Sequence, residues 1–79
     1  MAAPTTSACH EAQSALQASP FYDLRELEVE ETSDRRLVIR GLVGSFYHKQ
    51  LAQELVLTYA KANAYHVVNQ VEVVDALTN

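Results

Sequence analysis

Cysteine and positive charge are scarce in this chain. The single cysteine, Cys9, excludes an intramolecular disulfide and leaves a cysteine-based zinc site short of ligands. Six basic residues stand against ten acidic residues, which gives a formal net charge of −4. A general nucleic-acid binder needs a positive surface, so we expect no nucleic-acid partner. The sequence indicates neither a metal nor a cofactor.

Long apolar stretches are also missing. No run approaches the roughly 20 apolar residues that cross a bilayer, so no transmembrane segment is expected. The opening residues, MAAPTTSACHEAQ, have neither the basic nor the apolar region of a secretory signal. We expect a cytoplasmic protein if the chain is complete as given, and a periplasmic or envelope protein if a signal has been removed.

The length of 79 residues is that of one small domain. We expect residues 1–6 to form a disordered N-terminus and residues 7–79 to form a single domain. A chain of this size buries only about 60% of its unfolded surface, so an enclosed pocket would compete with the core. An exposed face is therefore the expected place for function.

Periodicity and turn chemistry give the order of the elements. An Ala-rich helix, capped by Thr6 or Ser7 and closed by Pro20, is expected within residues 7–19. A strand, a polar turn, a second strand, a long helix and a third strand follow. Their expected ranges are 24–31, 32–35, 36–43, 45–62 and 66–75.

These elements predict an α+β fold in the order α-β-β-α-β. The first two strands are joined by a short turn and should pair as an antiparallel hairpin. The long helix is a crossover that returns the third strand parallel to the second. We expect a three-stranded mixed sheet packed on two helices. In the long helix, Leu51, Leu55 and Tyr59 share a face, with the smaller Ala52, Val56 and Ala60 beside them.

The junction between the second strand and the long helix is the most informative segment. The only two glycines, Gly41 and Gly44, both fall there, and Ser45 stands where a helix N-cap belongs. Alternation along the strand places Leu37, Ile39 and Val43 on one face, and Arg40 and Leu42 on the other.

The junction and the last strand resemble the BON domain, a family named for bacterial osmotically inducible and nodulation proteins. The resemblance covers residues 21–75. The matching residues are Leu37, Ile39, Gly41, Val43, Ser45, Gln50, Leu51, Ala52, Leu55, Val67, Asn69, Val71 and Val73. It implies a non-catalytic alpha/beta module that binds phospholipid or an envelope protein. The family's glycine before the last strand is replaced by Asn63-Ala64-Tyr65, where we expect Asn63 to take the left-handed conformation.

The start of the long helix is the candidate contact surface. Phe46, Tyr47, His48 and Lys49, extended by Arg40, are expected to contact anionic phospholipid, with the rings at headgroup depth. The alternative is that Phe46 packs into the core and the others are an ordinary helix start. Cross-strand pairing of Arg40 and its neighbouring arginines with Glu28 and Glu30 is the preferred interpretation of that cluster.

A soluble protein–protein interaction or self-assembly module is the main alternative, with a partner strand added at the acidic edge formed by Glu26, Glu28 and Glu30. An enzyme is not expected. Ser45, His48 and Asp23 are the residue types of a catalytic triad, but Ser45 is better explained as the N-cap of the long helix. The Gly41–Gly44 spacing also matches the loop of a KH nucleic-acid domain, but a strand end explains it better.

Overall fold

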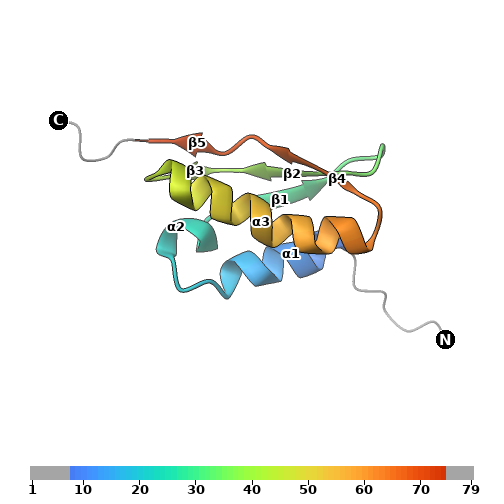
Figure 1. The fold of residues 1–79 in the computed structure, drawn as a ribbon, viewed down its shortest axis with the longest axis horizontal. Helices are drawn as coiled ribbons and strands as arrows, with labels where there is room; N and C mark the ends of the chain where they lie inside the picture. The colour runs from blue at the N-terminus through green and yellow to red at the C-terminus, as the bar shows by residue number, and fades with distance from the viewer. Residues whose placement is uncertain (1–7, 75–79) are drawn as a thin grey trace.

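The computed structural model describes residues 8–74, so the expectations for residues 1–6 and for a cap at Thr6 or Ser7 lie outside the described residues. It is an α+β domain in the expected order, with the second and third predicted strands each divided in two and one additional helical turn (Figure 1). The elements are α1 (Ala8–Gln17), α2 (Tyr22–Arg25), β1 (Glu28–Glu31), β2 (Arg36–Arg40), β3 (Leu42–Val43), α3 (Phe46–Ala62), β4 (His66–Asn69) and β5 (Glu72–Val73).

The main sheet has the strand order β1-β2-β4. The antiparallel β1–β2 hairpin and the parallel β2–β4 pair are both as predicted. The turn between β1 and β2 closes through the Thr32 N–H on the Arg36 carbonyl at 2.9 Å. Helices α1 and α3 lie side by side on one face of this sheet (Figure 1).

Strands predicted as continuous are each interrupted once. The strand predicted over 36–43 breaks at Gly41, which has φ +138°, and the strand predicted over 66–75 breaks opposite it at Gln70 and Val71. A side chain is disfavoured at such a φ. The parallel pairing nevertheless continues past the break in one register, with β3 beside β5.

The core lies between the helices and the sheet. Leu37, Ile39 and Val43 are buried on the helix side, as the alternation predicts, whereas Leu42 is exposed. Along α3, Ala52, Val56 and Ala60 are fully buried, and the larger Leu51, Leu55 and Tyr59 are only partly buried at its flanks. The small side chains allow close approach of α3 to the sheet and to α1.

The first strand begins later than predicted. Residues 22–25 form the helical turn α2 instead of the start of a strand, because Phe21 accepts the N–H groups of Leu24 and Arg25 and the Leu24 side chain is buried. Strand β1 is therefore confined to Glu28–Glu31.

The left-handed residue after α3 is Ala64 rather than Asn63. Ala64 has φ 60°, whereas Asn63 has φ −124°. Arg35 also has a positive φ, 62°. Its guanidinium donates to the carbonyls of both residues and lies 4.4 Å from the centre of the Tyr65 ring. The hairpin turn thus holds the helix exit in this conformation.

Candidate functional site

Large apolar side chains are exposed where α2, β3, β5 and the first turn of α3 meet. These elements lie together at one end of the molecule, on the left in Figure 1. The exposed residues are Phe21, Tyr22, Leu42, Phe46, Tyr47 and Val74, and we call this surface the aromatic end. Phe46 is 76% exposed, so the interpretation that packed it into the core is wrong.

A polar cluster fixes the backbone beneath these rings. One carboxylate oxygen of Asp23 accepts the Gly44 N–H at 2.8 Å and lies 3.0 Å from Nδ1 of His48. The hydrogen bonds from His48 and then from Gly44 lower the pKa of the Asp23 carboxyl. The His48 ring in turn stacks at 4.8 Å from that of Phe21. Asp23 therefore joins α2 to the beginning of α3.

The Asp23–His48 pair is not part of a hydrolytic triad in the described residues. The hydroxyl of Ser45 accepts the backbone N–H of His48 at 3.2 Å, as the predicted N-cap should. Between residues 8 and 74 no hydrogen bond joins that hydroxyl to the His48 ring. The arrangement positions a helix start and offers no activated nucleophile.

Cations at the aromatic end come from two residues. The guanidinium of Arg25 lies 5.6 Å from the centre of the Tyr22 ring. Lys49 is half-buried on α3 and makes no ion pair within residues 8–74. Arg40, predicted to extend the patch, binds Glu30 and Gln70 on the sheet face that the helices leave uncovered. The Arg40–Glu30 contact confirms the preferred cross-strand pairing for Arg40. The prediction is wrong for the two neighbouring arginines, because Arg36 pairs with Asp34 and Arg35 donates to the carbonyls of Asn63 and Ala64.

The residues of the predicted structural motif have distinct tasks. Gly41 forms the strand break, and the Gly44 N–H donates to the Asp23 carboxylate. Val43 is buried in the core. Asn69 ties the last strand to α3: its amide nitrogen donates to the Lys49 carbonyl at 3.1 Å, and its oxygen accepts the Val71 N–H at 3.1 Å.

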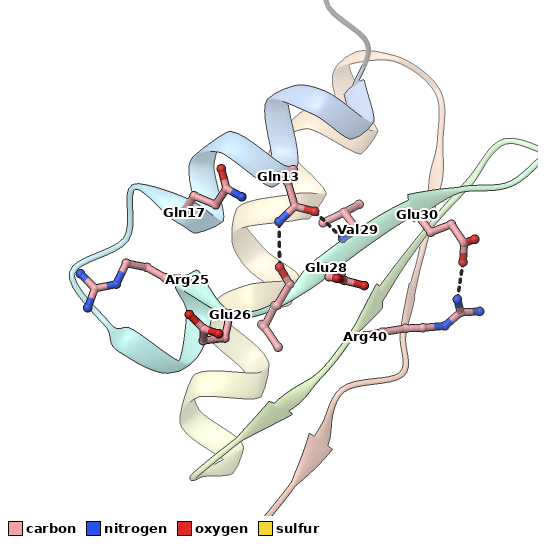
Figure 2. Close-up of a pocket in the computed structure, with 9 residues that line it drawn as sticks. Gln13, Gln17, Arg25, Glu26, Glu28, Val29, Glu30 and Arg40 are labelled. Atoms are coloured by element: carbon pink, nitrogen blue, oxygen red, sulfur yellow. Dashed lines mark hydrogen bonds and ion pairs between the residues drawn. The ribbon is translucent and has the colours of Figure 1, made fainter.

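A pocket of about 500 Å³ lies beside β1, between the C-terminal half of α1 and α2 (Figure 2). It has a mixed lining of charged and amide side chains: Gln13, Gln17, Arg25, Glu26, Glu28, Glu30 and Arg40, with Leu27 and Val29. No three His, Cys, Asp or Glu side chains in the described part of the chain gather to hold a metal ion.

The β1 edge, predicted as a docking edge, is already covered. The Gln13 amide donates to the Leu27 carbonyl at 2.7 Å and accepts the Val29 N–H at 2.8 Å (Figure 2). The Cys9 thiol, whose pKa is raised by burial, donates to the Val29 carbonyl. Helix α1 therefore occupies the position that a partner strand would need, and the prediction of strand addition here is wrong.

Sequence reasoning missed Gln13 and Tyr22, and it named Asp23 only in a catalytic set that it rejected. Asp23 and Gln13 act through contacts far apart in the sequence, for which no local pattern exists. Tyr22 carried a weak signal, since it directly follows the Pro20-Phe21 helix stop.

No family model, curated protein or solved structure matches this chain. In the part of the chain that the structure describes, no helix has both the length and the hydropathy needed to cross a membrane.

Proposed function

We propose that this chain is a non-catalytic, BON-like binding module that associates with phospholipid surfaces through its aromatic end. The observation that carries the proposal is the exposure of Phe46, Tyr22, Tyr47 and Leu42, each at least 60% exposed, on elements that meet at one end. Patches of this kind mark interaction sites, because folding alone gives no reason to expose them together.

The composition of the patch favours a lipid interface. Tyrosine rings combine an apolar body with a hydroxyl and are enriched at the headgroup level of bilayers. Phe46 and Leu42 supply apolar groups for the acyl boundary, and Lys49 and Arg25 supply cations for phosphate. The net charge of −4 opposes binding at long range, so contact rests on local insertion rather than on general attraction.

The rigid backing of the patch supports the same function. The bonds of Asp23 to Gly44 and His48 order the first turn of α3 before any ligand arrives. A preorganised surface loses less conformational entropy on binding. The resemblance to the BON family, which rests on residues 21–75, agrees with this use.

The test is a two-dimensional amide NMR titration with anionic and with neutral vesicles. Broadening of residues 44–49 and of Tyr22 by vesicles, with residues 58–62 unaffected, is the expected result. Phe46→Ala should weaken vesicle binding about tenfold, in line with the transfer free energy of a phenyl side chain.

A matched pair of variants tests the charge contribution. Lys49→Glu should weaken binding to anionic vesicles roughly tenfold or more, since each cation near the surface contributes about 1 kcal/mol. Lys61→Glu makes the same charge change about 18 Å further along α3 and should have little effect. Unchanged spectra with both vesicle types would overturn the proposal and leave the aromatic end to a protein partner.

A further inference from the structure

The outer edge of β4 and β5 is the second edge of the sheet. The N–H groups of His66, Gln70, Glu72 and Val74 bond inward, to carbonyls within residues 35–43. Because successive residues of a strand point their backbone groups to opposite sides, Val67, Asn69 and Val73 present theirs outward. Within residues 8–74, no strand pairs with this edge.

The two edges of the sheet are treated differently. Side chains of α1 bond to the edge of β1, whereas residues 66–74 carry neither such a cover nor the lysine or proline that commonly protects an edge strand. Five of these nine residues are valine, which favours strands, and the only acidic residue is Glu72. Among residues 8–74, side chains close the β1 edge and no strand covers the β4–β5 edge.

We propose that a second copy of this chain pairs antiparallel with the β4–β5 edge, about a two-fold axis at Asn69. This register places His66 of each copy directly opposite Glu72 of the second copy, and Val68 opposite Gln70. Both His66 and Glu72 are exposed side chains, so in each facing pair the imidazole can donate a hydrogen bond to the carboxylate. The edge is therefore complementary to itself, as a two-fold interface requires.

The backbone groups fit this register. The Val67 N–H faces outward and meets the carbonyl of Val71 in the second copy. The Val71 N–H is already bonded to Asn69 Oδ1, so each Val67–Val71 pair contributes one hydrogen bond. An axis at Gln70 instead would place Glu72 opposite Val68 and lose the contact between His66 and Glu72. The paired sheet has six main strands and carries its two aromatic ends at opposite extremes.

Sedimentation equilibrium of the full 79-residue chain, from low micromolar to millimolar concentration, tests the proposal. A monomer–dimer equilibrium is expected. His66→Glu and Glu72→Lys should each raise the dimer Kd roughly three- to tenfold. An equimolar mixture of the two variants should regain wild-type affinity, because the mixed dimer keeps one His66–Glu72 contact and joins the introduced glutamate to the introduced lysine in the other.

Val67→Pro tests the edge itself. It removes an N–H that the protomer does not use, so the variant should keep its folded amide spectrum and lose the dimer. A chain that stays monomeric at all concentrations would overturn the proposal, as would a dimer that tolerates Val67→Pro. A dimer lost in Val67→Pro but indifferent to the charge variants would overturn the register. Vesicle binding by the monomeric variants tests the proposed lipid contact of the aromatic end independently of the proposed dimer.

Discussion

The side-chain amide of Gln13 bonds to the backbone N–H of Val29 at 2.8 Å, as the peptide group of a neighbouring strand would. Its nitrogen completes the match by donating to the Leu27 carbonyl at 2.7 Å. A helical side chain thereby satisfies backbone groups that an edge strand normally leaves to water or to another chain. This contact explains why helix α1 docks against the sheet although its buried residues are mostly small.

Gln13→Ala should destabilise the domain by about 1–3 kcal/mol, because it leaves two part-buried backbone groups without partners. The measurement is the midpoint of urea unfolding at neutral pH. Gln17→Ala is the matched control: Gln17 lines the same pocket from the same helix, is exposed, and makes no bond to β1 in the described structure. Equal midpoints for the two variants would contradict the role given to Gln13.

Acid should weaken the junction between α2 and α3. The pKa of the Asp23 carboxyl is lowered, first by the hydrogen bond from His48 and then by that from Gly44. A carboxyl with a depressed folded-state pKa adds stability above its unfolded pKa of about 3.9 and loses it as the pH falls through the folded value. Asp23→Asn should therefore flatten the fall in stability below about pH 4, measured by urea unfolding across that range.

His48→Gln tests which hydrogen bond lowers the pKa of Asp23. With the imidazole removed, the pKa of Asp23 should move up toward the ordinary value for an aspartate, because the largest stabilising contact of the carboxylate is gone. Carboxyl-carbon NMR titration of Asp23 measures it directly. An unaltered Asp23 titration in this variant would assign the shift to the Gly44 N–H instead.

The sequence predicted those features that depend on interactions between residues close together in the chain. The Ser45 cap, the alternation of Leu37, Ile39 and Val43, and the Thr32 turn each depend on residues within a few positions of one another. The order of elements then follows, because a tight turn makes a hairpin and a long crossover helix makes a parallel pair.

Features set by distant contacts were beyond such reasoning. The strand expected from Leu24 is a helical turn because the Leu24 side chain is buried and Asp23 binds Gly44, twenty-one residues away. The sequence position of Arg40 predicts a place in the contact patch, yet its partners are Glu30 on β1 and Gln70 between β4 and β5. Exposure of Phe46 likewise depends on which face of α3 meets the sheet, and Ala52, Val56 and Ala60 decide that.

Ala64→Gly should stabilise the domain. Ala64 has φ 60°, a conformation that costs an L-residue roughly 1–2 kcal/mol and glycine very little, partly offset by glycine's greater freedom when unfolded. We expect a gain of about 0.5–1 kcal/mol, measured by thermal unfolding. Ala62→Gly, at the last residue of α3, should lose stability, by at most about 1 kcal/mol. A loss of stability in both variants would contradict strain at Ala64.

Gly41→Ala should be among the most damaging small substitutions in the chain. An added Cβ would lie 2.5 Å from Cδ2 of Leu27, a fully buried side chain, and the backbone at φ +138° disfavours any side chain. Strain at such a φ alone costs about 1–3 kcal/mol, so we expect a loss of at least 2 kcal/mol in urea unfolding.

Two further variants separate the contributions at Gly41. Gly44→Ala meets only the Asp23 carboxylate, at 3.3 Å, without a positive φ, so its cost should be smaller than that of Gly41→Ala. Combining Gly41→Ala with Leu27→Ala removes the steric contact but not the backbone strain. If backbone strain dominates, the two losses will add; if the clash dominates, the double variant will be more stable than their sum implies. A Gly41→Ala protein as stable as wild type would show that the strand break at this position does not require glycine.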